Sequence, residues 1–382
     1  MPLAHFSSKL KQIVVLGGGV AGLFTAYYLA KEGASVMLVE KEELGAGSVH
    51  AAGLIEPQTV YQINTISYLR DALQFAKRGV LTIKSVDGNW ALCYLRALAS
   101  PKSEDPSLFE MLRSMSQFSL CEYRRLAQED REWSYQEKGL LELYEEKNSF
   151  EEALSEHKKR GTQYEVVEKE GYAGGIFFKE VGSVCTELFV QRMAKELSNV
   201  EILKAKAERV ELDGSIQVSG RTLKPEVVVA AMGVECRKLG VPVTAVKGVG
   251  HRVSSPKKLD TPVIVYERSL ALVSFDDWTK ITSGLGFDFS PTSEDSQLDY
   301  AKGFLGELKL IDSKVGFRPC SPDGLPIIGR KQNVVVVTGG FRLGWSLAPA
   351  MGRYAADLAL GRVKEYPYIS RYVKGTHSAY LK

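Results

Sequence analysis

The segment that most constrains this fold lies at residues 12–42 and reads QIVVLGGGVAGLFTAYYLAKEGASVMLVEKE. An apolar strand leads into the turn Gly17-x-Gly19-x-x-Gly22, an apolar helix follows, and a second strand ends at Glu40. In such a unit the first glycine makes the turn, the second lets the backbone approach a pyrophosphate, and the third lets helix and strand pack closely. The helix amino terminus attracts the anion. The segment therefore predicts a dinucleotide-binding βαβ unit in which Glu40 binds the adenosine ribose.

The rest of the chain does not continue as regular βα units. A stretch of small residues without strand pattern follows at 41–58, and buried strands return only at 227–231 and 334–337. Three returns to one parallel sheet predict a discontinuous dinucleotide domain with another domain threaded through it. This organisation favours a flavin. The alternative, a nicotinamide-dependent dehydrogenase, is disfavoured because nothing resembles a second nucleotide site.

A second sheet is expected from stretches rich in aromatic and β-branched residues. These predicted strands lie at 138–146, 173–184, 249–254 and 262–288, and helical patterns lie at 65–78, 104–130 and 186–197. We expect an α/β chain, α+β overall, in which a Rossmann-like domain interlocks with a substrate domain on a mixed or antiparallel sheet. The predicted boundaries are 1–85, 185–243 and 314–382 for the cofactor domain, and 86–184 and 244–313 for the substrate domain.

Composition excludes several functions. Lys plus Arg number 49 against 46 Asp plus Glu, a net charge of +3, so no nucleic-acid footprint is expected. The five cysteines include no CxxC pair, which argues against a zinc site or a disulfide framework and favours a cytoplasmic location. No apolar segment approaches the length of a membrane span; residues 90–99 leave a peripheral contact with the inner membrane face open. Homo-oligomerisation is also left open, and the low asparagine content is typical of heat-adapted proteins.

Five further blocks carry a family resemblance. They are SVHAAG at 48–53, VVVAAMG at 227–233, AVKG at 245–248, GFRPCSPDGLPIIG at 316–329 and GGFRLGWSLAPAMG at 339–352. Together with the glycine-rich turn, they resemble the D-amino acid oxidase family of FAD enzymes, which includes glycine oxidases, D-amino acid dehydrogenases and dye-linked proline dehydrogenases. Regions 54–175 and 250–310, which choose the substrate, match poorly.

The resemblance implies roles for two arginines. Arg318 is expected to clamp the substrate carboxylate through a two-pronged ion pair, and Arg342 to lie near the flavin and the same carboxylate. Two structural alternatives remain open: Arg318 pairs with Asp323, or Arg342 pairs with a neighbouring carboxylate that holds its turn. Further candidate active-site groups are His50, Tyr266 and Arg268.

The resemblance also implies a set of residues that contact FAD. The set is Gly17, Gly19, Val20, Ala21, Gly22, Glu40, Lys41, Ser48, Ala51, Ala52, Gly53, Leu54, Val210, Ala231, Met232, Gly233, Gly316, Arg318, Gly340, Arg342, Leu343, Gly344 and Trp345. Non-covalent FAD is expected, because Cys320 stands a few residues later than the flavin-linked cysteine of relatives such as sarcosine oxidases. No metal site is expected.

The predicted function is FAD-dependent oxidation of the Cα–N bond of a free amino or imino acid, by hydride transfer to flavin N5. D-Alanine and D-proline are the preferred substrates, and the imine product hydrolyses to a 2-oxo acid or remains cyclic. The electron acceptor is a quinone, an artificial dye or oxygen. Alternatives are a glycine or sarcosine oxidase, an L-proline dehydrogenase, and a non-catalytic flavin-binding subunit.

Overall fold

The chain is described by a computed structural model that covers residues 11–59, 62–99, 106–292 and 297–381. Within these residues one sheet has six strands in the order β10-β2-β1-β14-β21-β20. The bounds are β1 (Gln12–Leu16), β2 (Ser35–Glu40), β10 (Glu201–Lys204), β14 (Val227–Ala230), β20 (Ile327–Lys331) and β21 (Val334–Thr338). Only β20 runs antiparallel to its neighbour. The valine-rich central strands are buried on both faces, as a parallel sheet covered by other elements requires.

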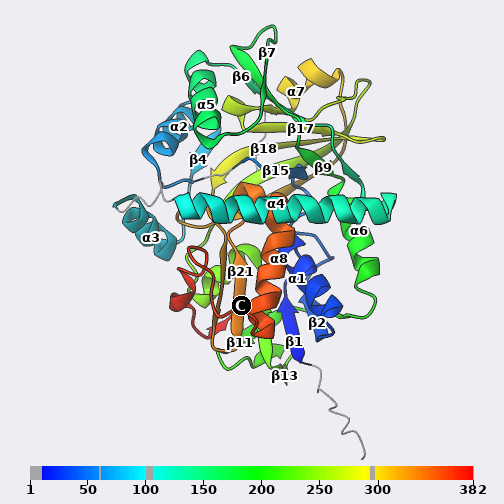
Figure 1. The fold of residues 1–382 in the computed structure, drawn as a ribbon, viewed down its shortest axis with the longest axis vertical. Helices are drawn as coiled ribbons and strands as arrows, with labels where there is room; N and C mark the ends of the chain where they lie inside the picture. The colour runs from blue at the N-terminus through cyan, green and yellow to red at the C-terminus, as the bar shows by residue number, and fades with distance from the viewer. Residues whose placement is uncertain (1–10, 60–61, 100–105, 293–296, 382) are drawn as a thin grey trace, which may run out of the picture.

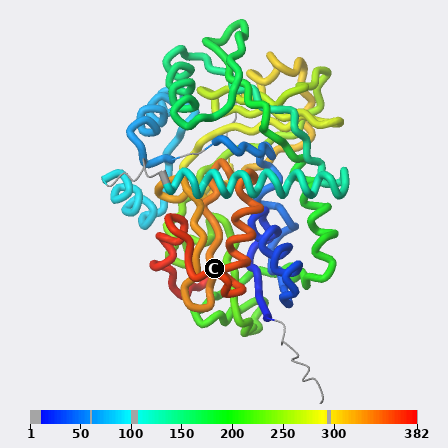
Figure 2. Tube along the Cα trace, in the orientation of Figure 1, coloured from blue at the N-terminus to red at the C-terminus, as the bar shows by residue number. Residues whose placement is uncertain are grey.

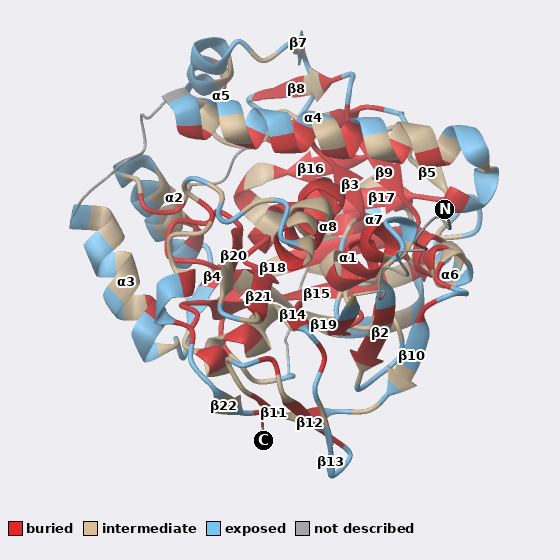
Figure 3. Cartoon of the chain, turned by 60° about the horizontal axis from the view of Figure 1, so that its bottom comes forward, coloured by how far each residue is buried: buried red, intermediate tan, exposed pale blue. Residues whose placement is uncertain are grey.

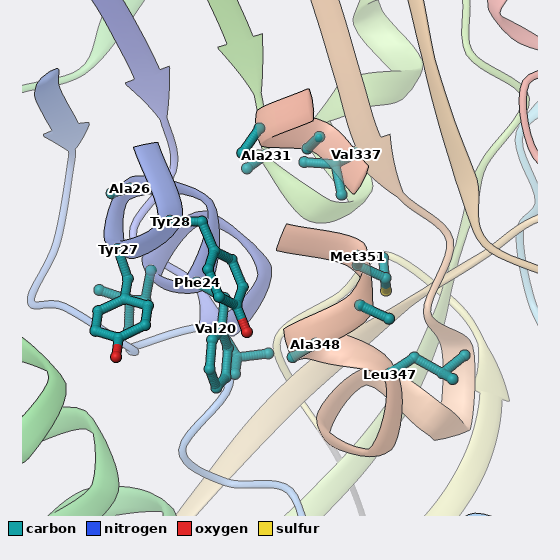
Figure 4. Close-up of a cluster of buried hydrophobic side chains, with 14 of the residues drawn as sticks. Val20, Phe24, Ala26, Tyr27, Tyr28, Ala231, Val337, Leu347, Ala348 and Met351 are labelled. Carbon is teal, nitrogen blue, oxygen red and sulfur yellow. The ribbon is translucent and has the colours of Figure 1, made fainter. Parts of the chain in front are cut away.

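Two helices from opposite ends of the chain pack against each other on one face of this sheet (Figure 4). They are α1 (Val20–Lys31) and α8 (Gly344–Leu360). A Cβ at Gly352 would lie 2.5 Å from Phe24 Cβ, so a glycine is needed where the two backbones approach. The long helix α4 (Pro106–Glu129) and α6 (Thr186–Glu196) extend the same core.

The other face of the sheet is covered by a small four-stranded sheet and two 3-10 turns. These elements are β11 (Ala207–Val210), β12 (Ile216–Val218), β13 (Arg221–Leu223), β22 (Ala379–Tyr380), η2 (Gly233–Leu239) and η5 (Val373–Gly375). Their buried side chains form one cluster with Val14, Leu16 and Val39.

A second large sheet contains nine strands among the described residues, in the order β19-β15-β18-β17-β16-β6-β8-β7, with β4 beside β18. Its strands are β4 (Leu81–Ile83), β6 (Leu140–Tyr144), β7 (Glu165–Val167), β8 (Gly174–Phe178), β15 (Thr244–Ser254), β16 (Val263–Val265), β17 (Leu270–Ser274), β18 (Thr279–Phe287) and β19 (Lys309–Cys320). The pairs β6·β16 and β4·β18 are parallel and the others antiparallel, so the expected mixed sheet is confirmed.

The remaining elements surround this sheet. They are β3 (Leu54–Ile55), β5 (Tyr135–Gln136) and β9 (Gly182–Val184), which pair together, with α2 (Ile66–Lys77), α3 (Gly88–Ala99), α5 (Lys147–Arg160), α7 (Gln297–Leu305), η1 (Arg131–Trp133), η3 (Tyr266–Arg268) and η4 (Phe341–Leu343). In Figure 1 the nine-stranded sheet occupies the upper half of the molecule, and α4 runs along the boundary between the halves.

The discontinuity expected from the sequence is visible in Figure 2, where blue N-terminal and orange C-terminal segments share the lower half. The domain boundaries stay a prediction, and two of them do not match the elements. The 313/314 boundary falls inside β19, and β4 pairs within the nine-stranded sheet although residues 1–85 were assigned to the cofactor domain. Helix α4, assigned to the substrate domain, packs instead in the core of α1 and α8, because its buried face meets that pair.

Burial divides the molecule into a dense centre and an exposed rim. Figure 3 shows α1 and α8 largely buried at the centre, whereas α3 presents exposed and half-exposed residues. None of the helices in the described ranges is long and apolar enough to cross a bilayer.

Candidate cofactor site and active site

The glycine-rich turn has the close contacts that its sequence predicts. Gly17 has φ +104°, and a Cβ there would lie 2.5 Å from the carbonyl oxygen of Ala231. A Cβ at Gly22 would lie 1.9 Å from the Gly17 oxygen, so α1 cannot pack on this turn with any larger residue. Gly19 is the N-cap of α1 and brings no capping side chain, and a Cβ there would approach only Ser48 Oγ, at 3.3 Å. This open helix terminus fits a pyrophosphate.

Glu40 and Ser48 flank that helix terminus. The Glu40 carboxylate, at the carboxyl end of β2, accepts hydrogen bonds from the Gly18 N–H (2.5 Å) and the Glu42 N–H (2.8 Å). The Val20 N–H donates to Ser48 Oγ at 3.0 Å. Acid and helix terminus thus meet at the edge of the sheet where nucleotides bind in folds of this kind.

The loop that carries Ser48 is anchored to two elements that are distant in the chain. Trp345 Nε1, in the first turn of α8, donates to the Ser48 carbonyl at 3.0 Å. Lys280 Nζ, from β18 of the other sheet, donates to the Val49 carbonyl at 2.7 Å and to both oxygens of Glu187 at 2.8 and 2.9 Å. Lys280 is 1% exposed, so this is a buried ion pair that ties the nine-stranded sheet to the loop and to α6.

Two glycines open the face of β15 that is turned toward the same loop. Side chains alternate along a strand, so Gly248 and Gly250 share one face, about 7 Å apart. A Cβ at Gly248 would lie 2.4 Å from Arg318 Nη1, and one at Gly250 would lie 2.2 Å from the His50 oxygen. The Arg318 guanidinium and the main chain of His50 therefore lie over neighbouring glycines on this face.

Arg318 Nη1 donates hydrogen bonds to two main-chain carbonyl groups, that of Gly284 at 2.9 Å and that of Lys247 at 3.5 Å. Asp323, the alternative partner considered from the sequence, forms an ion pair with Arg371 instead. These two carbonyl groups fix the position of the guanidinium over Gly248.

His50 is a half-buried histidine whose main chain lies over Gly250. Its Nε2 is buried and has no hydrogen-bond partner within the described ranges. Burial, together with the positive charges of Lys314 and Lys280, lowers the pKa of His50. A neutral imidazole with an unsatisfied nitrogen fits a ligand in this position.

Arg342 lies among carboxyl groups of the protein. Burial raises the pKa of Glu56, and the positive charge of Arg342 partly offsets that shift. Burial raises the pKa of Glu142 to about 7, with the charge of Glu56 adding to the rise and that of Arg342 opposing it. This arrangement supports the structural alternative for Arg342, a pair that holds its turn, and leaves Arg318 as the better candidate for the substrate carboxylate.

Tyr266 and Arg268 both bond to acids of the protein. The Tyr266 hydroxyl donates to Asp71 at 2.9 Å, and its ring packs on Tyr144 at 5.3 Å. Arg268 Nε forms an ion pair with Glu145 at 2.6 Å. Tyr266 stays a candidate at the wall of the site; Arg268 is better explained as a surface ion pair.

The other predicted cofactor residues fall into three groups. One group follows β14 beside the glycine turn: Ala231, Met232 and Gly233. A second group continues the segment 41–58 that carries Ser48, which we name the flavin loop: Ala51, Ala52, Gly53 and Leu54. The third group forms the turn into α8: Gly340, Arg342, Leu343, Gly344 and Trp345. Two do not join these groups: Lys41 is exposed and pairs with Glu42, and Val210 is buried in the core behind β1. A Cβ at Gly316, on β19, would meet open space.

Several residues around the candidate site were missed from the sequence: Glu56, Glu142, Asp71 and Lys280. The sequence does carry a signal for Glu142. In the strand LLELY (140–144), Leu140, Glu142 and Tyr144 lie on the same, buried face, and a carboxyl group between two buried hydrophobic residues is unusual. Within the described ranges, no three His, Cys, Asp or Glu side chains are grouped as metal ligands.

The fold and the site together define a dinucleotide-dependent oxidoreductase with a discontinuous nucleotide domain and a second sheet that closes over it. The family model described as "DAO: FAD dependent oxidoreductase" matches residues 12–358. This chain belongs to that family of FAD-dependent oxidoreductases. The prediction of FAD over a nicotinamide cofactor is confirmed, and the glycine turn, Ser48 and the unsatisfied His50 nitrogen fit that cofactor.

Relatives agree in sequence and in fold. The D-proline dehydrogenase of Pyrobaculum islandicum is 36% identical over 359 residues, covering 92% of this chain and 96% of the relative. The D-amino acid dehydrogenase of Helicobacter pylori is 25% identical, and the alignment covers 91% of this chain and 95% of the relative. Glycine oxidase from Bacillus cereus superposes with a TM-score of 0.71 at 19% identity, covering 97% of this chain and 98% of that one. L-Proline dehydrogenase from P. horikoshii superposes with a TM-score of 0.65 at 17% sequence identity, covering 96% of this chain and 99% of that one.

Proposed function

We propose that this chain is an amino-acid dehydrogenase that oxidises the Cα–N bond of a free D-amino or D-imino acid, with D-proline as the first choice. One observation carries the proposal: the Arg318 guanidinium lies over Gly248, beside the flavin loop, and is held there by carbonyl groups. Such a fork can bind a carboxylate through two charge-assisted hydrogen bonds.

Bound FAD supplies the hydride acceptor, and the resulting imine hydrolyses to a 2-oxo acid or remains cyclic. The protein supplies position and charge. The amino terminus of α1 would hold the pyrophosphate and Glu40 the ribose, and residues 340–345, at the amino end of α8, would offer backbone N–H groups to negative charge on the flavin ring. Arg318 orients the substrate by its carboxylate, which fixes where Cα lies.

The choice of D-proline rests on the relative that is 36% identical over most of both chains and is named D-proline dehydrogenase. D-Alanine remains the second choice. Glycine, sarcosine and L-proline are the alternative substrates, supported by fold similarity to glycine oxidase and L-proline dehydrogenase at less than 20% identity.

The test is anaerobic bleaching of the FAD absorbance by D-proline, D-alanine, glycine, sarcosine, L-proline and L-alanine. We expect D-proline to reduce the flavin fastest. Reduction by glycine or L-proline alone would overturn the substrate assignment, and reduction by none of the panel would support a non-catalytic flavin-binding subunit. Reoxidation of the reduced enzyme by oxygen, compared with a soluble quinone or dye, identifies the acceptor.

The FAD is proposed to be non-covalent. Cys320 is fully buried, and burial raises the pKa of its thiol well above the ordinary value, so no reactive thiolate is offered. Acid precipitation should leave all the flavin in the supernatant. Flavin that stays with the protein pellet would contradict this.

Peripheral membrane contact remains a proposal. Ile66 and Leu73 on α2 and Leu92 and Leu95 on α3 are exposed apolar side chains, and the last two lie in the segment 90–99 singled out from the sequence. Co-sedimentation with anionic vesicles tests it. Protein that stays in the supernatant at low salt would contradict it.

A further inference from the structure

Strand β18 changes its neighbour partway along its length. Residues 279–282 pair with β17, whereas residues 285–287 pair with β4. Ser283 and Gly284 lie between these two ladders, and neither register, as formed by the described residues, includes them. A main-chain carbonyl at such a gap can accept a hydrogen bond from a side chain.

The opposite edge of β18, which pairs with β15, carries a β-bulge at the same place. The register shifts there, so that β15 has one residue, Gly248, where β18 has two, Gly284 and Leu285. The two strands lie beside each other in the upper half of Figure 1. Gly284 has φ +85°, in the left-handed region that glycine adopts without strain. The bulge therefore gives Gly284 a carbonyl direction that differs from that of a regular strand.

Both sides of this bulge contact the same guanidinium. The Gly284 carbonyl accepts a hydrogen bond from Arg318 Nη1 at 2.9 Å. On the other side, a Cβ at Gly248 would lie 2.4 Å from the same nitrogen. The single glycine of β15 leaves room for the guanidinium, and the extra glycine of β18 supplies a carbonyl that holds it.

Glycine at position 284 is required by backbone conformation and not by lack of space. A Cβ there would lie 3.7 Å from Gly248 Cα, which is an ordinary van der Waals distance. A side chain therefore fits, but an ordinary L-residue resists the left-handed conformation. Substitution at this position changes the direction of the carbonyl without a steric clash.

The bulge is also fixed from the other face of the sheet. Side chains alternate along a strand, so the Lys247 side chain points away from the face of Gly248. Lys247 Nζ forms a buried ion pair with Asp288 at 2.6 Å and donates to the Thr292 carbonyl at 2.6 Å. The end of β18 is thereby tied to β15 just beyond the bulge, which keeps the two strands from slipping past each other.

We propose that Gly284 is a positioning residue for the substrate carboxylate, because its left-handed conformation turns the carbonyl that holds Arg318. The inference rests on the proposed function, in which Arg318 binds that carboxylate. A displaced guanidinium displaces the bound carboxylate, and with it the Cα that must face the cofactor. Gly284 should therefore affect ligands that carry a carboxylate and leave other ligands unaffected.

Gly284→Ala tests the proposal. We expect KM for D-proline, and the inhibition constant of the unreactive analogue tetrahydrofuran-2-carboxylate, to rise about tenfold, as for loss of one hydrogen bond to a charged group. Flavin reduction by pyrrolidine, which has no carboxylate, should keep its rate. Gly284→Asn should regain most of the loss, because asparagine adopts the left-handed conformation more readily than alanine.

The matched control is Gly33→Ala. Gly33 also has a left-handed conformation, with φ +78°, and a Cβ there would meet nothing within 4 Å. This control should lose stability as Gly284→Ala does, as measured by thermal unfolding, but bind the carboxylate analogue like wild type.

A double-mutant cycle separates positioning from a general loss of structure. If Gly284 acts through Arg318, adding Gly284→Ala to Arg318→Ala should not raise the inhibition constant further, whereas independent effects would add. Should Gly284→Ala fail to fold, the same cycle with Gly284→Asn should show a smaller rise that Arg318→Ala again abolishes.

Three results would overturn the role of Gly284 while the wild-type activity stands: a wild-type inhibition constant in Gly284→Ala, equal losses for the carboxylate analogue and pyrrolidine, or additive effects in the cycle. A wild-type enzyme that no amino acid reduces would overturn the proposed function itself, and this inference with it.

Discussion

Arg318 shows how a charged side chain is kept ready for a ligand. Its guanidinium lies over a glycine, is held at 2.9 Å by the Gly284 carbonyl, and is not paired with Asp323, which Arg371 neutralises. The carbonyl groups of Gly284 and Lys247 orient the fork. An incoming carboxylate then needs little rearrangement of the protein to be bound.

Replacing Arg318 with alanine should remove substrate binding and leave the flavin in place. Loss of one partner of a desolvated charge pair costs roughly 3–5 kcal/mol, which predicts a rise in the substrate Kd of at least two to three orders of magnitude. Arg318→Lys should recover only part, because an ammonium cannot form the planar fork. Substrate titration of flavin absorbance measures this. An equal loss with an uncharged amine would assign Arg318 to the fold or the flavin, and the carboxylate to Arg342.

Gly248→Ala probes the same geometry from below. The added Cβ would lie 2.4 Å from Arg318 Nη1, so the guanidinium must move. We expect KM for D-proline to rise about tenfold, because one charge-assisted hydrogen bond to the substrate is misplaced. The flavin content should stay unchanged. Gly303→Ala is the matched control, because a Cβ there meets nothing within 4 Å. A Gly248→Ala enzyme with wild-type KM would show that the substrate does not use this arginine position.

At the scale of elements, the βαβ unit and the flavin loop both contribute residues to the candidate cofactor site. Glycine is required at positions 17 and 22, because a Cβ there would lie 2.5 and 1.9 Å from backbone oxygens, whereas a Cβ at Gly19 would meet only Ser48 Oγ within 4 Å. Gly17 and Gly22 serve packing, and Gly19 leaves room for a ligand.

Gly19→Leu and Gly22→Ala should therefore behave differently. Gly19→Leu should fold with near-wild-type stability but purify without colour, because its side chain fills the anion site. Gly22→Ala should lose stability as well, since its Cβ collides with backbone. Flavin content and thermal unfolding distinguish the two. A fully yellow Gly19→Leu protein would mean that the pyrophosphate binds elsewhere.

The ion pair between Lys280 and Glu187 joins β18, α6 and the flavin loop. Lys280→Met should destabilise the protein by roughly 3–5 kcal/mol, because Glu187 is left without its partner. Lys280→Met with Glu187→Leu should regain most of that loss, since two apolar groups replace the pair. Urea unfolding of the four proteins in this double-mutant cycle gives the coupling. A coupling energy near zero would show that the pair does not clamp the sheets.

At the scale of the whole molecule, two acids are buried where the flavin loop packs on the nine-stranded sheet. Glu142 and Glu56 are buried at this junction because the flavin loop and β6 come together there. Buried carboxyls without full charge compensation make the fold sensitive to pH.

Stability of the apoprotein should fall as the pH rises from about 4.5 to about 7. The folded-state pKa of Glu142 is raised to about 7 from an ordinary value of 4.5, so the folded protein holds a proton that the unfolded chain has released. The loss is on the order of 3 kcal/mol, complete above pH 7. Acids with lowered pKa, such as Glu32 at about 2, act below this window. Denaturant unfolding across pH should show the fall in wild type and a flatter curve in Glu142→Gln; identical curves would contradict it.

The local signals in the sequence were sufficient for the elements that stand on their own patterns. The glycine turn with Glu40, the valine strands and the helices at 65–78, 104–130 and 186–197 were all predicted and are present. Strand β10 was not, because three of its four residues are exposed at a sheet edge and no apolar alternation marks it. The four-stranded sheet, built of very short strands, and α5, which has no buried face, were missed for similar reasons.

The sequence by itself determined the nucleotide unit, because turn, helix and acid lie within 31 consecutive residues and act through local backbone geometry. It also indicated Arg318 and Arg342 through short blocks that resemble a family. Only the tertiary structure decided their partners. Asp323 forms an ion pair with Arg371, 48 residues away in the chain. Arg342 interacts electrostatically with Glu56 and Glu142, which are distant in the chain and are brought together when the flavin loop packs on β6. Charge pairing depends on distance in space, which no local pattern records.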